Sequence, residues 1–172
     1  QTCALPILNI AQQIIEAHKL KFGSLPPLQQ CSVSGSALFN ADCMDILPLI
    51  PDKSVQLILA DLPYGVTNLK WDSVLDLNKL WFEYKRVLKD NGAIVLTATN
   101  PFAAMLISSN YEMFKYDFVW HKNCPSSPAL AKRQIMRQHE LVLVFYKKQC
   151  VFNPVMEEYS ESSKSRIKYS FK

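Results

Sequence analysis

The stretch LILADLPYG, residues 57–65, carries an apolar run into a carboxylate and then an aromatic ring. An apolar run bounded by turn signals is typical of a strand in a parallel sheet. Ligands of open α/β sheets bind at the carboxyl ends of the strands, where Asp61 would stand. The Asp61 carboxylate and a backbone carbonyl can accept the two hydrogens of an exocyclic amine, while Tyr64 stacks on the planar group that bears it. A strand-end aspartate that caps a turn beside a half-buried tyrosine is the alternative for these residues alone.

The elements around this stretch alternate between helix and strand. Apolar spacing predicts helices over 8–22, 42–50 (with Asp42 near its start), 74–89 (ended by Asp90-Asn91-Gly92) and 102–108. Apolar runs predict strands over 37–41, 54–61, 93–99, 116–122 and 141–148, the last two as an antiparallel pair. This order indicates an α/β fold, a partial doubly wound, Rossmann-like sheet that is mostly parallel with an antiparallel hairpin at one edge. We expect the 54–61 strand to be buried on both faces.

Composition excludes several classes of protein. The 172 residues are 49% hydrophobic, which suits one globular domain with a core, and the net charge of +4 is mildly basic. No apolar run reaches the roughly 18 residues of a membrane span, and no signal peptide is recognisable. Five cysteines without a C-x-x-C pair predict neither a disulfide framework nor a metal site, and therefore a cytoplasmic setting.

The chain divides into three parts. Residues 1–36 read as a helix followed by a Ser/Pro/Gln-rich linker, and QTCALPI, residues 1–7, resembles a translated sequencing adapter. Residues 37–154 carry the α/β pattern. Residues 155–172 are polar and are expected to be a tail or the start of a further region.

The segment 38–65, LFNADCMDILPLIPDKSVQLILADLPYG, resembles the opening of the DNA amino-methyltransferases. These enzymes transfer a methyl group from S-adenosylmethionine to adenine N6 or cytosine N4, and their signature is D-P-P-Y after a segment like G-D-C-x-x-x-L. The resemblance continues through NGAIVLTATNPF, YDFVWHKN and QHELVLVFYKK and covers roughly 37–154. Leu62 replaces the first proline and Ala41 the glycine; Leu62 keeps the carbonyl but loosens the turn.

The resemblance implies a role for each motif residue. Asp61 and the carbonyl of Leu62 would accept from the target amine, Pro63 would stiffen the turn, and Tyr64 would stack on a base extruded from the duplex. Asp42, with Cys43 beside it, matches the position where the family contacts the cofactor, and Asp61 lies at the same site. The implied cofactor is S-adenosylmethionine, and the implied partner is double-stranded DNA, with a restriction endonuclease as a further partner in a restriction-modification pair.

Cations in the 121–137 segment are the candidates for DNA contacts, because phosphates are bound by such side chains. They are Lys122, Lys132, Arg133 and Arg137. A solvated loop is the alternative interpretation. His139 and Glu140 are expected to order the sheet edge or the base pocket, and Trp71 to wall that pocket or lie in the core.

Glycine is scarce, with four residues and no two of them close together. The glycine-rich turn that admits the cofactor in this family is therefore missing. In the permuted class that turn follows the catalytic motif, so we expect an N-terminal fragment of an adenine-N6 methyltransferase, inactive by itself. The alternatives are a cytosine-N4 enzyme, an RNA or protein N-methyltransferase, and a non-catalytic DNA-binding remnant.

Overall fold

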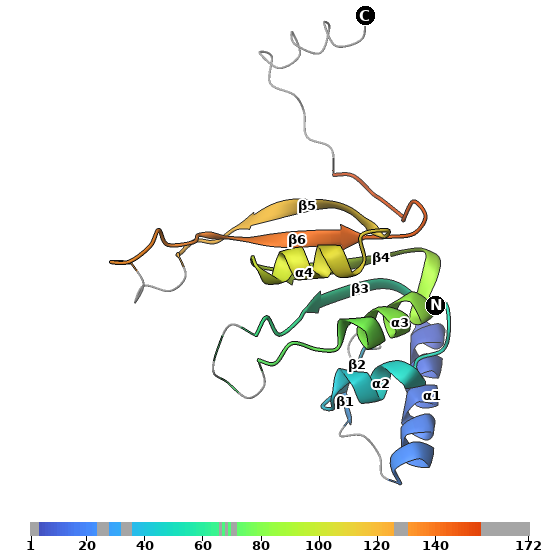
Figure 1. Ribbon diagram of the computed structural model, residues 1–172. Coiled ribbons are helices and arrows are strands. Elements are labelled where there is room, and N and C mark those ends of the chain that lie inside the picture. The colour runs from blue at the N-terminus through green and yellow to red at the C-terminus, as the bar shows by residue number, and fades with distance from the viewer. Residues whose placement is uncertain are drawn as a thin grey trace, which may run out of the picture.

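The computed structural model describes residues 4–23, 28–31, 36–65, 67, 69, 72–125 and 131–155 (Figure 1). The helices are α1 (Ala4–Phe22), α2 (Cys43–Ile46), the 3-10 helix η1 (Leu47–Leu49), α3 (Leu77–Val87) and α4 (Phe102–Ser109). The strands are β1 (Leu28–Cys31), β2 (Ser36–Phe39), β3 (Val55–Asp61), β4 (Leu88–Ala98), β5 (Phe114–His121) and β6 (His139–Phe145). The proposed adapter-like segment and C-terminal tail lie partly outside the described residues, as does Trp71.

A four-stranded sheet with the order β3-β4-β6-β5 forms the centre of the structure. Strands β3 and β4 are parallel, whereas β6 is antiparallel to both of its neighbours, β4 and β5. Three strands therefore run in one direction and β6 runs against them. The predicted α/β fold, mostly parallel with an antiparallel hairpin at one edge, is confirmed. The strands β1 and β2 form a separate antiparallel pair.

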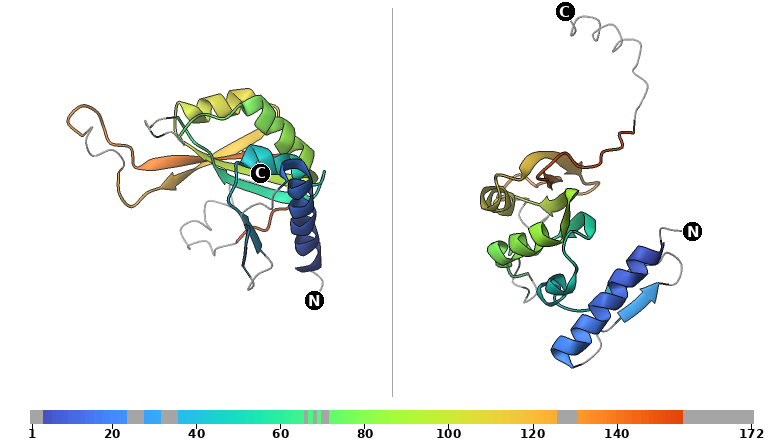
Figure 2. Two further views of the ribbon diagram at one scale, coloured as in Figure 1. Left: turned by 90° about the horizontal axis from the view of Figure 1, so that it is seen from below. Right: turned by 90° about the vertical axis from the view of Figure 1, so that its right-hand side faces the viewer.

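Helices α3 and α4 cover one face of this sheet, as Figure 2 shows. The core between them and the sheet includes Leu80 and Trp81 of α3, Phe102 of α4, and Ile94 and Leu96 of β4. Each of these side chains is almost completely buried. This core fixes the position of the carboxyl ends of β3 and β4 relative to α3 and α4.

The other face of β3 is open, which corrects the prediction that this strand is buried on both faces. Leu57 is 55% exposed and Leu59 is 69% exposed. Within the described residues β3 pairs with β4 alone, so it is an edge strand of the sheet. The alternate residues Ile58 and Ala60 pack against the core, as period-two geometry requires.

The prediction that Asp90-Asn91-Gly92 ends the third helix is also wrong. Helix α3 ends at Val87, and β4 begins at Leu88 and contains all three residues. The Gln56 side-chain amide donates to the Asn91 carbonyl at 2.9 Å, where the β3–β4 register shifts. A Cβ on Gly92 would lie 2.9 Å from the Gln56 carbonyl oxygen, so this glycine permits close approach of the two strands.

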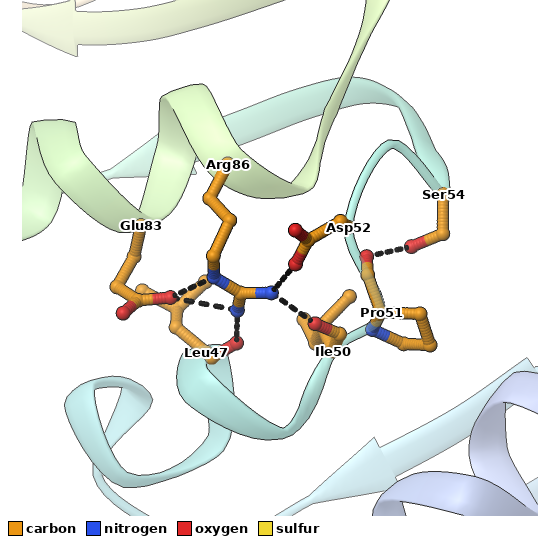
Figure 3. A network of polar contacts seen from close by, with 7 residues as sticks. All are labelled: Leu47, Ile50, Pro51, Asp52, Ser54, Glu83 and Arg86. Atoms are coloured by element: carbon orange, nitrogen blue, oxygen red, sulfur yellow. Dashed lines mark hydrogen bonds and ion pairs between the residues drawn. The ribbon is translucent and has the colours of Figure 1, made fainter.

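Arg86 of α3 ties the helix to the segment that precedes β3 (Figure 3). Its guanidinium donates to the carbonyl oxygens of Leu47 at 2.8 Å and Ile50 at 2.7 Å. It also pairs with the carboxylates of Glu83 at 2.7 Å and Asp52 at 2.5 Å. Because η1 follows α2 directly, this network holds α2 and the start of β3 against α3.

Candidate active site

Asp61 is the last residue of β3, and it pairs across the sheet with Thr97 of β4. The Thr97 hydroxyl lies 2.5 Å from Asp61 Oδ1. The Tyr64 hydroxyl donates to the same oxygen at 2.8 Å and lies 3.2 Å from Thr97 Oγ1. The sequence pattern singles out Asp61 and Tyr64 together, and the structure joins them directly. The pattern misses Thr97, which reaches them only through the strand register.

The Tyr64 ring is held by the core. It stacks on the ring of Phe102 in α4, with 5.4 Å between centroids and 29° between the planes. Burial raises the pKa of Tyr64 well above its usual range. The hydrogen bond between Tyr64 and Thr97 opposes this rise, while the hydrogen bond and charge of Asp61 and the charge of Glu140 add to it. The hydroxyl therefore stays protonated and remains a hydrogen-bond donor at neutral pH.

The turn that carries Tyr64 is fixed on both sides. Leu62 is buried in the core cluster, and Pro63 restricts the backbone between Leu62 and Tyr64. Gly65 has φ +68°, a conformation that favours glycine, and its amide donates to Asp72 Oδ1 at 2.8 Å. The sequence pattern gives Asp72 no role, and the structure shows that it binds this turn.

A cavity of about 230 Å³ lies at the same edge of the sheet, where β4 ends and β6 begins. Its lining residues are Thr99, Asn100, Arg137, His139, Glu140 and Leu141. Glu140 forms an ion pair with Lys122, and both residues are partly buried. Glu140 acts on the pKa of the Tyr64 hydroxyl through its charge, so the cavity and the Asp61 turn share one electrostatic environment.

The four predicted DNA-binding cations divide into two pairs. Lys122 is paired with Glu140 of the cavity wall, and Arg137, which itself lines the cavity, donates to the Asn100 carbonyl at 3.1 Å. Lys132 and Arg133 are exposed on the segment between β5 and β6. Figure 1 shows residues 131–138 extending beyond the sheet at the end where the β3 arrow points. Arg137 is exposed as well, so Lys132 and Arg133 are the exposed cations that do not line this cavity.

Asp42 and Cys43 lie at the start of α2. Asp42 is the N-cap residue, and its Oδ1 accepts from the Met44 amide at 2.8 Å, as the predicted helix start requires. Cys43 is exposed as a residue. Partial desolvation of its thiol raises the thiol pKa, and the negative charge of Asp42 raises it further. In the described part of the chain no hydrogen bond or ion pair joins Asp42 to Asp61, Tyr64 or Thr97.

Two kinds of feature are absent from the residues that the structure describes. Within those ranges, no group of three His, Cys, Asp or Glu side chains is arranged to hold a metal ion. The described helices include none that is long and apolar enough to cross a membrane.

A family model for DNA methylases of the N6 and N4 type matches residues 55–171, most of the chain. The chain belongs to this family. The resemblance drawn from the D-L-P-Y segment is thereby confirmed. The matched span contains every predicted site residue except Asp42 and Cys43.

Three solved structures are similar to this chain. The M1.HpyAVI–SAM complex is 22% identical, with 61% of this chain and 53% of that chain covered and a TM-score of 0.42. A DNA modification methylase from Thermus thermophilus, TTHA0409, is 20% identical, with 73% and 58% covered and a TM-score of 0.49. The cytosine-N4-specific PvuII DNA methyltransferase is 16% identical, with 65% and 49% covered and a TM-score of 0.48. The chain spans about half the length of these structures.

Proposed function

We propose that the complete protein transfers a methyl group from S-adenosylmethionine to the exocyclic amine of a DNA base, and that the base is adenine, modified at N6. Membership of the DNA methylase family supports the reaction class. The observation that carries the site assignment is the position of Asp61 and Tyr64 at the carboxyl end of β3, at the same edge as the polar cavity.

The chain's own residues orient the amine. Asp61 and the Leu62 carbonyl accept its two hydrogens, so that the nitrogen lone pair is drawn out of conjugation and directed at the methyl group. The cofactor supplies an electrophilic methyl group carried on a sulfonium sulfur. Tyr64 stacks on the base, which has to be extruded from the duplex because its amine is unreachable inside the stack.

The residues present fit part of a cofactor site. Asp42 and Asp61 are exposed carboxylates, suited to the hydroxyl and amino donors of a nucleoside. Cys43 adjoins Asp42 on α2. A glycine-rich turn is absent from the 172 residues, which contain four separated glycines. We therefore propose that this chain alone neither binds the cofactor measurably nor methylates DNA, and that its open β3 edge lowers its solubility.

The exposed residues Lys132 and Arg133 are proposed to contact DNA phosphates, together with Arg137 of the cavity wall and Lys122, the partner of Glu140. A restriction endonuclease of the same sequence specificity is the further proposed partner. A DNA substrate fits the cytoplasmic location that the cysteine pattern predicts.

The test is methyl incorporation by the complete protein into unmethylated DNA, followed by digestion to nucleosides and identification of the product. N6-methyladenine is the expected product. N4-methylcytosine would move the assignment to the alternative cytosine-N4 enzyme. An absence of incorporation by folded complete protein with DNA bound would favour the non-catalytic DNA-binding alternative and overturn the proposal.

A further inference from the structure

Thr97 of β4 is paired with Asp61 of β3, the residue proposed to orient the target amine. Asp61 and Thr97 are paired residues of two adjacent parallel strands, and both strands end at this edge. The sheet register therefore sets their separation, rather than the conformation of a loop. The resulting distance between Thr97 Oγ1 and Asp61 Oδ1 is 2.5 Å, a charge-assisted hydrogen bond.

The hydrogen bonds of Asp61 are unevenly divided between its two oxygens. The hydroxyls of Thr97 and Tyr64 both donate to Oδ1. Among the residues that the structure describes, none donates to Oδ2. One oxygen is thus occupied by protein donors, and the other is left as an acceptor at the carboxyl end of β3.

We propose that Thr97 is a positioning residue for methyl transfer, because it fixes the rotation of the Asp61 carboxylate so that Oδ2 faces the target amine. This inference rests on the proposed function. The terminal torsion of an aspartate is broad and roughly two-fold, so an unrestrained carboxylate samples many orientations. A hydroxyl mounted on a paired strand removes that freedom before the base arrives.

Tyr64 cannot replace Thr97 in this role. Tyr64 lies in the turn after β3, and its ring is committed to the stack on Phe102 and to the proposed contact with the base. Its single hydroxyl hydrogen is also shared, since Asp61 Oδ1 at 2.8 Å and Thr97 Oγ1 at 3.2 Å are both within reach. Thr97 is the donor whose position is set by strand pairing, with Asp61 of β3 on one side and Val142 of β6 on the other.

The chain allows the hydroxyl to be tested apart from packing. Thr97 is half-buried on a strand, so Thr97→Val keeps the β-branched shape and removes the hydroxyl that donates to Asp61 and lies within reach of the Tyr64 hydroxyl. Thr97→Ser is the matched variant, because it keeps the donor and removes the methyl group. Steady-state methylation by the complete protein is measured for both, beside the parent protein and Asp61→Ala, and thermal unfolding is followed in parallel.

We expect Thr97→Val to lower kcat by about 10-fold or more, the loss expected for one hydrogen bond to a charged group. KM for DNA should stay within about twofold, and Thr97→Ser should restore most of kcat. A Thr97→Val protein with the parent kcat would overturn the inference. A Ser variant as slow as the Val variant would also overturn it, and so would a decrease in kcat that merely parallels a decrease in melting temperature. If Asp61→Ala is inactive while Thr97→Val is normal, the inference alone fails. If the folded parent protein transfers no methyl group, the proposed function fails and takes this inference with it.

Discussion

Asp72 binds the backbone of the turn that begins at Gly65, seven residues before it in the sequence. Its Oδ1 accepts from the Gly65 amide at 2.8 Å, and its Oδ2 accepts from the Thr67 amide at 2.6 Å. The side chain is buried, with 7% of the residue exposed. A carboxylate that accepts from two backbone amides at this site holds the turn that presents Tyr64.

We therefore expect Asp72→Ala to lower the free energy of unfolding by about 2 kcal/mol, since two part-buried hydrogen bonds from backbone amides to a carboxylate are lost. Methyl transfer by the complete protein should fall further than this decrease in stability explains, because the turn that carries Tyr64 is released. Urea denaturation and a methylation assay measure the two effects.

The matched control for this variant is Asp76→Ala. Asp76 caps α3 through the Asn78 and Lys79 amides, and its removal should cost about 1 kcal/mol without slowing methyl transfer. Equal activity of the Asp72 and Asp76 variants would contradict a role for Asp72 in holding the site.

Tyr64 has two separable functions in the site, the ring and the hydroxyl. Tyr64→Ala removes the surface proposed to stack on the base and the contact with Phe102, and should reduce kcat at least 100-fold, in line with about 3 kcal/mol for base stacking. Tyr64→Phe keeps the ring, and Thr97 still donates to Asp61 Oδ1, so the reduction should be within about 10-fold. A Phe variant as slow as the Ala variant would show that the ring is not the essential part.

Lys132 and Arg133 should contribute to DNA affinity at all sequences. Replacing both with Gln should weaken duplex binding and lower the slope of log Kd against log salt by about 2, one unit for each phosphate that the variant no longer neutralises. The control is Lys85→Gln with Lys89→Gln, two exposed lysines at the opposite end of the sheet. Equal slopes for the two double variants would make Lys132 and Arg133 a solvated surface.

The fold and the Asp61 turn could be predicted from sequence because both depend on local patterns. An apolar run, a carboxylate and D-L-P-Y mark the end of β3 and the turn after it. Thr97 could not be found this way, since its contact with Asp61 depends on the register between two strands 36 residues apart. Similarly, Asn91-Gly92 resembles a helix stop in isolation, yet it serves the close approach of β4 to Gln56. Propensity describes the neighbourhood of a residue, whereas pairing is a property of the whole sheet.

The open face of β3 could not be predicted from its sequence either. A continuous apolar run suggests burial on both sides, and Leu57 and Leu59 are nevertheless exposed in the described residues. The pattern reports what the strand is suited to contact. It does not show whether another element covers each face of the strand, and α3 and α4 cover one face only.

The central claim, that Asp61 orients the amine that receives the methyl group, is tested most directly by methyl incorporation into unmethylated DNA by the complete protein carrying Asp61→Ala. The matched control is Asp117→Ala, an exposed aspartate on β5. We predict that the Asp61 variant loses methyl transfer while its affinity for duplex DNA stays close to that of the parent, because Asp61 faces the amine and not the phosphates. The Asp117 variant should behave as the parent. Near-normal turnover by Asp61→Ala would contradict the account.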